Sequence, residues 1–307
     1  MILNVIDKIY SSIPISNIFW RSIRYFFRVM ANIYVRYVMP LPHHISSNIE
    51  TNTVIVSLTS FPARIRNVWM TCATLLNQKY TDIHIVLYLT KDEFPHGYDN
   101  LPKTLTKLKK RGLDIRIIED VNLRPHNKYF WALKDFPYNT VITVDDDILY
   151  SPKLISELMK IHAQYNDCVI CNRGITIKKT NYREWVNNIY LEEKRSDILA
   201  TGVGGVLYPA HIFDNTPIFD KDAISSTCLN ADDLWLSFMT RFKNNKVVQT
   251  KFKVGLLTIL SSQDKALCIS NVGEDRNDEQ IRLLSQWAEK KFGFDFFHNC
   301  ELNSFHL

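Results

Sequence analysis

The sequence predicts an α/β fold, with a mixed, mainly parallel sheet and helices on both of its faces. Two observations favour this class. From residue 53 onward, short apolar runs alternate with helical stretches, the order expected of strands joined by crossover helices. The chain also has 307 residues, 46% of them hydrophobic, which is enough to bury a sizeable core.

The predicted strands and helices alternate along the chain. Four apolar runs suit buried strands, at residues 53–60, 83–90, 114–120 and 140–144. Helical stretches lie between them, at residues 68–77, 101–110 and 128–134. In the less regular second half we expect a strand at 168–172, a glycine-broken loop and strand at 198–208, and helices at 232–242 and 278–291.

The chain divides into four predicted parts. An N-terminal segment, residues 1–48, precedes a first half-domain at 49–155 and a second at 156–275, and residues 276–307 form a C-terminal helix and tail. A change of pattern near Ser151 and Pro152 marks the boundary between the half-domains. We expect the two halves to share one sheet.

Residues 17–37 predict a basic amphipathic helix. At about 100° per residue, one face carries Arg21, Arg24, Arg28, Asn32 and Arg36, and the other carries Ile23, Phe26, Phe27, Met30, Ile33, Tyr34 and Tyr37. Such a helix either packs on its own domain or lies in an anionic bilayer surface, with the arginines among the headgroups and the aromatic rings below. We favour the membrane surface.

A bilayer-spanning helix and a cleaved signal peptide are not expected at the N-terminus. The uncharged run at residues 9–20 is shorter than a bilayer requires and is interrupted by Pro14. The chain also lacks a basic start before an apolar run and a small-residue cleavage site.

The charge and the cysteines argue against two classes of protein. A formal charge of +5 is too modest for this length to favour nucleic-acid binding. The six cysteines lie in apolar segments, so we expect small buried thiols in a reducing compartment. Cys168 and Cys171 have the spacing of a zinc knuckle, but no second pair follows, so a structural zinc site is not expected.

Three adjacent carboxylates, Asp145, Asp146 and Asp147, follow the apolar run at residues 140–144. In an open parallel sheet, ligands bind beyond the carboxyl ends of the strands, which is where this order places them. Three like charges repel one another, and a bound cation offsets that cost. Oxygen ligands favour Mn²⁺ or Mg²⁺, which commonly bridge a carboxylate to substrate phosphates. The alternative is a solvated turn in which Asp147 caps the next helix.

Residues 141–152 (VITVDDDILYSP) resemble the DXD region of nucleotide-sugar-dependent glycosyltransferases with the GT-A fold. The surrounding order is similar to a bacterial branch, like family 2, that builds capsular and lipopolysaccharide glycans. The matching landmarks are residues 57–65 (SLTSFPARI), 127–133 (NKYFWAL), 171–177 (CNRGITI), 201–209 (TGVGGVLYP) and 230–236 (NADDLWL). They lie within residues 53–271, so the resemblance implies a Rossmann-like GT-A domain with a nucleotide-sugar-binding half and an acceptor-binding half.

The resemblance implies a donor site built from the first half. It assigns nucleotide-sugar contacts to Thr59, Ser60, Arg64, Lys128, Asp145 and Asp146, and metal contacts to Asp145 and Asp147. Asp145 would hold the ribose or reach the metal through water, and Asp147 would ligate the cation that bridges the two phosphates. Lys128 would lie near the donor sugar or diphosphate; the alternative is an ordinary lysine on a helix surface.

The resemblance also implies that a carboxylate at the start of the helix at 232–242 takes a proton from the acceptor hydroxyl. A base there opposes the leaving diphosphate across the anomeric carbon, which gives inversion. The usual Glu-Asp pair is replaced here by Ala231, Asp232 and Asp233. Both aspartates are therefore candidate catalytic residues, with Asp232 first, and either could instead only cap the helix.

Four residues are expected to contact the acceptor, namely Arg173, Gly204, Gly205 and Trp235. Glycine lets a backbone approach a flat sugar closely, and tryptophan can stack on a sugar ring. Arg173 could instead form a surface salt bridge, the two glycines a strand bulge, and Trp235 part of the core. The histidines of the tail, His298 and His306, are not expected to bind metal or phosphate.

These expectations combine into one enzyme. It is a metal-dependent, inverting hexosyltransferase that moves a sugar from a nucleotide-sugar, most simply a UDP-sugar, to a glycan or lipid-linked acceptor. We expect this enzyme on the cytoplasmic side of a bacterial membrane, where residues 17–37 would bind it peripherally. The alternatives are a retaining transferase of the same fold, a metal-dependent nucleotidyltransferase, and a non-catalytic glycan-binding protein, which would not need both carboxylate clusters.

Overall fold

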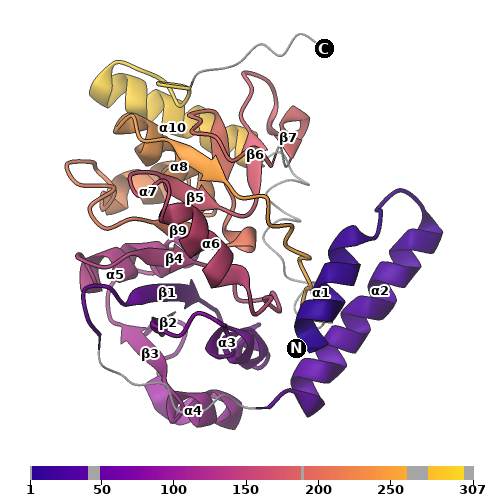
Figure 1. Ribbon diagram of the computed structural model, residues 1–307. Helices are drawn as coiled ribbons and strands as arrows, with labels where there is room; N and C mark the ends of the chain where they lie inside the picture. Colours follow the sequence, from indigo (N-terminus) through magenta and orange to yellow (C-terminus); the bar gives the residue numbers. More distant parts are fainter. Residues whose placement is uncertain (1, 41–48, 188–189, 261–275, 301–307) are drawn as a thin grey trace.

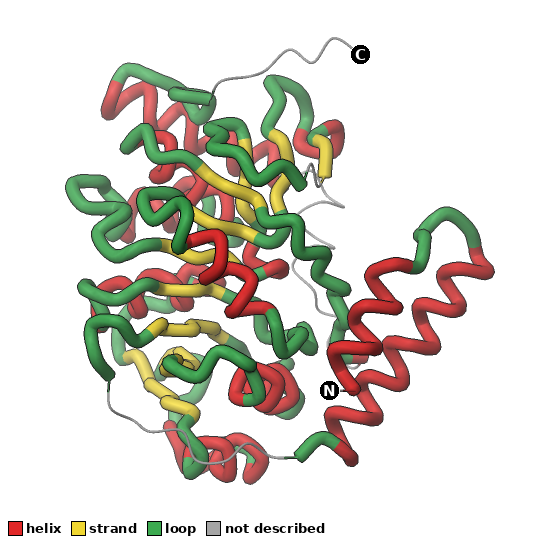
Figure 2. The backbone as a smooth tube through the Cα atoms, in the orientation of Figure 1, coloured by secondary structure: helices red, strands yellow, loops and turns green. Residues whose placement is uncertain are grey.

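The computed structural model describes residues 2–40, 49–187, 190–260 and 276–300 (Figures 1 and 2). Cys268 and His306 lie outside the described residues. The α-helices are α1 (Ile2–Ser12), α2 (Ile18–Ile33), α3 (Val68–Leu76), α4 (Lys103–Lys109), α5 (Asn127–Asp135), α6 (Leu154–His162), α7 (Lys221–Thr227), α8 (Asp232–Phe242) and α10 (Arg276–Phe292).

The strands are β1 (Val54–Thr59), β2 (Ile83–Thr90), β3 (Leu113–Ile118), β4 (Val141–Thr143), β5 (Val169–Cys171), β6 (Gly174–Thr176), β7 (Val186–Asn187), β8 (Ile198–Ala200), β9 (Val206–Tyr208) and β10 (Val247–Gln249). Short turns of other helix types are η1 (Tyr34–Val38), η2 (Gly97–Asn100), η3 (Arg124–His126), η4 (Tyr182–Glu184) and η5 (Gly202–Gly204).

The described residues form a seven-stranded sheet in the order β10-β5-β9-β4-β1-β2-β3. The pairs β1–β2, β1–β4, β2–β3 and β5–β10 are parallel, whereas β9 runs antiparallel to both β4 and β5. Strands from both predicted halves therefore share one sheet, as expected. A second, three-stranded antiparallel sheet has the order β7-β6-β8.

Helices cover both faces of the large sheet because its buried strands turn apolar side chains to each side in alternation. In β1, Val54, Val56 and Leu58 pack with residues of α3, α4 and α6. Ile55, on the opposite face of the same strand, packs with Ala132 of α5. The α/β class with helices on both faces is confirmed.

The two most N-terminal helices, α1 and α2, form a hairpin that projects from the body (Figure 1). The predicted contact of α2 with a membrane stays a prediction, but two of its arginines contact the protein itself and not headgroups. The polar face of α2 points to the protein: Arg24 donates to the carbonyls of Tyr10 and Ile13, and Arg28 and Asn32 bind Thr258. The guanidinium of Arg24 thus binds the carbonyls at and just beyond the end of α1, where a helix leaves such groups without its own amide partners.

The opposite, apolar face of α2 is exposed. Ile18, Phe19, Tyr25, Phe26, Met30 and Ile33 all stand in solvent. Within the described residues, no helix combines the length and the apolar character needed to cross a bilayer.

Candidate active site

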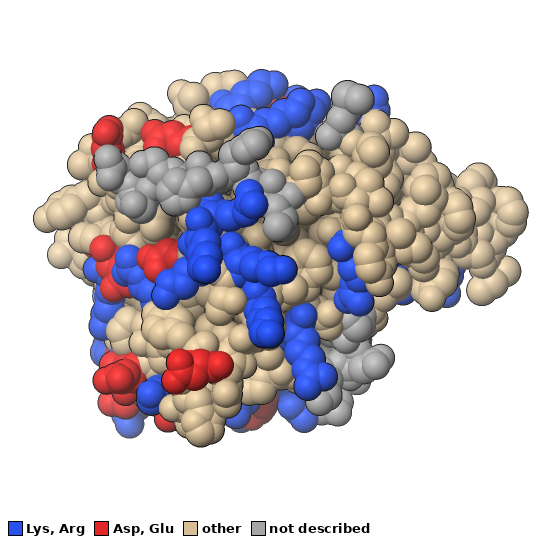
Figure 3. Space-filling model, turned by 90° about the horizontal axis from the view of Figure 1, so that it is seen from below, with Lys and Arg blue, Asp and Glu red and all other residues tan. Residues whose placement is uncertain are grey.

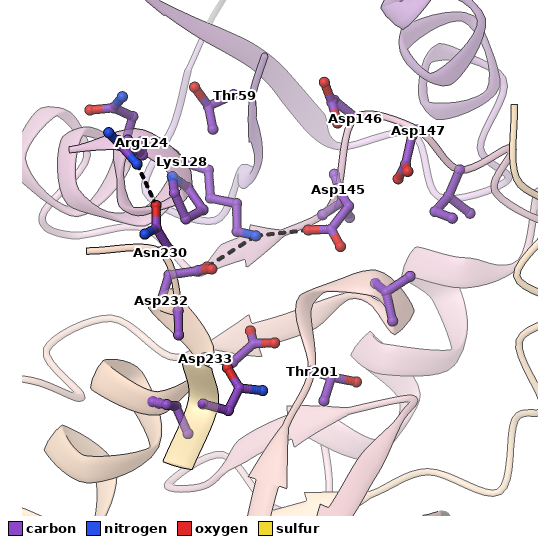
Figure 4. A pocket seen from close by; sticks show the side chains of 18 of the residues that line it. Thr59, Arg124, Lys128, Asp145, Asp146, Asp147, Thr201, Asn230, Asp232 and Asp233 are labelled. Atoms are coloured by element: carbon purple, nitrogen blue, oxygen red, sulfur yellow. Dashed lines mark hydrogen bonds and ion pairs between the residues drawn. The ribbon is translucent and has the colours of Figure 1, made fainter. Parts of the chain in front are cut away.

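A cavity of about 740 Å³ opens at the carboxyl ends of β1 and β4. Its walls come from the loop after β1, the start of α5, the loop after β4, the residues around β8 and η5, and the start of α8. In a parallel sheet these positions meet at one edge, so residues far apart in sequence line the same space. Figure 4 shows the two acidic groups on facing sides of this cavity.

The aspartate triplet lies where β4 ends. The amide of Asp145 donates to the Tyr150 hydroxyl at 2.9 Å, and that hydroxyl donates to the carbonyl of Val203 at 3.3 Å. Asp145 keeps 31% of its side chain exposed, whereas Asp146 and Asp147 keep 6% and 11%. Asp147 does not cap the following helix, because Lys153 holds the N-cap position of α6.

Arg64 neutralises the buried half of the triplet. Its guanidinium lies 2.6 Å from Asp146 and 3.1 Å from Asp147, and the Ser60 hydroxyl donates to the other oxygen of Asp146 at 2.6 Å. Burial still raises the pKa of Asp147 to about 6, an effect that Arg64 opposes and that Asp146 and Asp145 reinforce. The ionised form of Asp147 is therefore disfavoured despite its contact with Arg64.

Lys128 links the two acidic groups. Its ammonium lies 2.7 Å from Asp145 and 3.0 Å from Asp232, with only 6% of its side chain exposed (Figure 4). The hydroxyl of Ser57 in β1 donates to the Lys128 carbonyl, which fixes the start of α5 against the sheet. Burial lowers the Lys128 pKa, but Asp145 and Asp232 raise it well above its usual value, so Lys128 stays charged.

Asp232 and Asp233 open α8 but have different surroundings. Asp232 pairs with Lys128, whereas Asp233 accepts a hydrogen bond from the Gly202 amide at 3.0 Å. Burial raises the pKa of Asp233 well above its usual value, and the charge of Asp232 adds to that rise. Neither side chain caps the helix, since Ala231 holds the N-cap position with no side-chain cap.

The family model for glycosyl transferase family 2 matches residues 64–219, just over half of the 307 residues. The chain belongs to glycosyl transferase family 2. The match includes Arg64, Lys128 and the triplet, but it ends before α8, so the role of Asp232 and Asp233 depends on geometry alone. The predicted GT-A fold is confirmed.

Solved structures of low sequence identity are similar to this family 2 chain. S. aureus TarS 1–349 in complex with UDP is 15% identical, with a TM-score of 0.46 over 66% of this chain and 59% of that one. Mannosyltransferase PcManGT from Pyrobaculum calidifontis, in complex with GDP-Man and Mn²⁺, is 10% identical, with a TM-score of 0.46 over 94% of this chain and 76% of that one. This chain thus spans less than two thirds of the TarS structure. A search of curated proteins found no match.

Most residues predicted for the site of this family 2 chain line the cavity: Thr59, Ser60, Arg64, Lys128, Asp145, Asp146, Asp147, Arg173, Asp232 and Asp233. Their predicted roles are not tested by this placement. Both oxygens of Asp146 already accept hydrogen bonds, from Arg64 and Ser60, so this residue holds the loop after β1 in place. Thr59 donates its hydroxyl to the carbonyl of Tyr88.

Three predicted acceptor contacts need correction. Trp235 is fully buried, donates its indole N–H to the Ile218 carbonyl and packs against Trp287, so it is a core residue that does not line the cavity. Gly204 and Gly205 do not line it either. A Cβ on Gly204 would lie 2.7 Å from the Cβ of Arg173, so glycine is needed there for close packing. Gly205 has a φ of +80°, a conformation that favours glycine.

Gly202, from the same glycine-rich stretch, does not line the cavity but lies against its charged centre: a Cβ there would lie 2.9 Å from Lys128 Nζ and 3.1 Å from Asp145 Oδ1. Two residues that do line the cavity were not among the predicted site residues. Arg124, with a φ of +55°, donates to Asn230 at 2.7 Å across the cavity wall. The left-handed backbone at Arg124 has no sequence signal, whereas Asn230 is the first residue of the recognised NADDLWL stretch.

Proposed function

We propose that this chain transfers a sugar from a nucleotide-sugar, with a UDP-sugar as the expected donor, to a glycan or lipid-linked acceptor. One observation carries the proposal: a single cavity is lined by two acidic groups, one after β4 and one at the start of α8, with Lys128 between them. Sugar transfer has two charged tasks, holding a diphosphate and removing a proton from an acceptor, and two separate acidic groups suit them.

The donor set suits a hard divalent cation, Mn²⁺ or Mg²⁺. Asp145 and Asp147 supply carboxylate oxygens, and such cations are commonly held by one or two carboxylates plus substrate phosphates. No cluster of three or more potential metal-ligating side chains occurs among the described residues, so the substrate would complete the coordination. When bound, the cation would act as a Lewis acid and stabilise charge on the departing diphosphate.

Asp233 is our choice for the catalytic base, ahead of Asp232. Burial raises the pKa of Asp233 well above its usual value, so its carboxylate binds a proton readily, whereas the Asp232 carboxylate is paired with the Lys128 ammonium. Asp233 also lines the cavity beside Gly202, close to Asp145: a Cβ on Gly202 would lie 3.5 Å from Asp233 Oδ1 and 3.1 Å from Asp145 Oδ1 (Figure 4). In the proposed step, the acceptor oxygen bonds to the anomeric carbon as the bond from that carbon to the diphosphate oxygen breaks, and Asp233 receives the hydroxyl proton.

A panel of radiolabelled nucleotide-sugars tests this proposal, because many transferases slowly hydrolyse their donor and binding proteins do not. We expect hydrolysis of one donor in the presence of Mn²⁺ or Mg²⁺. Asp233→Asn should reduce acceptor transfer by about 10²–10⁴-fold, the range for loss of a general base. Hydrolysis of no donor would contradict the proposal.

The stereochemistry of the product separates the inverting mechanism from a retaining one. NMR of the glycoside formed from the donor and its acceptor gives the anomeric configuration of that product directly. Inversion supports direct displacement with an aspartate base; retention would contradict that mechanism and leave the two aspartates as ligands of sugar hydroxyls.

We further propose that the enzyme serves cell-surface polysaccharide biosynthesis at the cytoplasmic face of the cell membrane.

A further inference from the structure

The hairpin of α1 and α2 exposes an apolar surface that the rest of the described chain leaves uncovered. Three strongly exposed side chains lie near the turn between the helices: Ile18 is 79% exposed, Ile15 65% and Phe19 62%. The stripe continues along α2 through Tyr25, Phe26, Met30 and Ile33 to Tyr37 in η1, and α1 adds Ile2, Val5 and Ile9. Apolar surface of this extent on one projecting element marks an interaction site.

The hairpin is anchored on its other side. Leu3, Ile6 and Tyr10 of α1 and Ala31 of α2 share a buried cluster with Met70 and Leu257. The arginine face of α2 is also directed inward, through Arg24 and Arg28. Neither helix can therefore turn its exposed apolar face onto the body without breaking these contacts.

The charges around the hairpin identify its partner. Asp7 is the one acidic residue in 2–40 and it is 3% exposed, whereas the exposed Lys8, Arg21 and Arg36 are basic. In Figure 3 the hairpin projects as a largely uncharged surface, and Lys and Arg gather beside it on the underside of the molecule. That underside includes α4, where Lys103, Lys107 and Lys109 are exposed.

We infer that the hairpin docks the protein on an anionic lipid bilayer, with the apolar stripe of α2 in the acyl boundary and the neighbouring lysines over the headgroups. Apolar insertion combined with a basic surround is the composition that binds anionic bilayers. A second copy of the chain fits less well, because a two-fold interface would bring the same basic side chains face to face.

The docking surface is linked to the wall of the cavity. Arg28 and Asn32 of α2 bind Thr258, which lines the cavity, and the next amide, of Ile259, donates to the Asp147 carbonyl at 2.8 Å. A bilayer under the hairpin would therefore lie close to the site. That this position serves a lipid-linked acceptor rests on the proposed function, but the docking surface itself does not.

Vesicle co-sedimentation of the full chain tests the inference. We expect the protein to pellet with vesicles of equal phosphatidylglycerol and phosphatidylcholine and to bind pure phosphatidylcholine less, with salt weakening the difference. The variant Ile18→Asp/Phe19→Asp/Phe26→Asp should lose at least about tenfold in partitioning, because charges in the acyl boundary are costly. The single variant Ile18→Asp, at the most exposed position, should lose a smaller part.

A matched control carries the same change on the body. Val121→Asp/Tyr138→Asp/Leu191→Asp replaces three exposed apolar residues away from the hairpin and should bind vesicles as the wild type does. Donor hydrolysis and circular dichroism should be unchanged in both triple variants, which separates docking from folding and from sugar transfer.

Two vesicle results would overturn the inference: wild-type protein that stays in the supernatant with both vesicle types, or hairpin variants that bind vesicles like the wild type. A third result would do so as well: a wild-type protein that binds no vesicles and is a dimer, which the hairpin triple variant converts to monomers. If vesicle binding behaves as expected but no nucleotide-sugar is hydrolysed, the docking surface stands and the proposed function fails.

Discussion

Replacing Lys128 with methionine tests the charge balance at the centre of the site. The ammonium is buried and lies 2.7 Å from Asp145 and 3.0 Å from Asp232. With an effective dielectric constant of about 20, Coulomb's law gives about 6 kcal/mol of attraction for each contact. Desolvation already offsets much of this, and removing one partner of a buried pair typically costs about 3–5 kcal/mol. We expect a loss of that size in the free energy of unfolding near neutral pH.

The loss should depend on pH in a defined direction. Lys128 opposes the rise in the pKa of the buried Asp233, which is already well above its usual value in the native chain, so loss of the ammonium should raise that pKa further. Such an acid reduces stability as pH rises through the unfolded pKa toward the folded one. The deficit of Lys128→Met should therefore shrink from about pH 8 to about pH 5, as this carboxylate takes up a proton.

Urea unfolding followed by circular dichroism measures this deficit. Lys160→Met is the matched control, because Lys160 is exposed on α6, and the control should change stability by less than about 0.5 kcal/mol. A deficit for Lys128→Met below about 1 kcal/mol, or one that is the same at both pH values, would refute the reasoning.

Three further predictions concern other parts of the molecule. Gly202→Ala should lower kcat/KM at least about tenfold, because its Cβ would lie 2.9 Å from Lys128 Nζ; Gly97→Ala, with open space around it and a φ of +58°, should cost stability without affecting turnover. Burial raises the pKa of Asp7 to about 6, so the free energy of unfolding should fall as pH rises from about 4 to about 6. The variant Asp7→Asn should lack this pH dependence. In urea unfolding near pH 7, it should be more stable than the wild type by about 1–3 kcal/mol. Trp235→Ala should cost about 3–5 kcal/mol in the same assay, as a core residue does, and a stable variant with only a raised acceptor KM would restore its predicted acceptor role.

Much of the donor half could be predicted because local pattern and topology agree there. The apolar runs of β1, β2 and β4 are buried on both faces, and the acids after β4 could only meet the end of β1 if the strands were parallel. The helix predicted at 232–242 has those bounds in α8, because its apolar periodicity begins directly after a pair of acids.

The sequence could not predict which groups meet across the fold. Nothing local shows that Arg64 pairs with two aspartates about eighty residues later, or that Asp232 shares Lys128 with Asp145. The antiparallel direction of β9 was not predicted, although a strand was expected within residues 198–208. The short helices α6 and α7 were missed, since helices of about two turns carry weak periodicity. For α2, the periodicity gave two faces correctly, but the inward contacts of Arg24 and Arg28 depend on Tyr10, Ile13 and Thr258, which belong to other parts of the chain.

The central claim is that a divalent cation at Asp145 and Asp147 brings a nucleoside diphosphate into the cavity. Isothermal titration calorimetry of the wild type and of Asp147→Asn with UDP and GDP, each with Mn²⁺ and with EDTA, tests it most directly. We predict that Mn²⁺ tightens the binding of one diphosphate to the wild type at least about tenfold, or about 1.4 kcal/mol, and has no such effect on the variant. Equal binding with and without Mn²⁺, or the same response in the variant, would contradict the account.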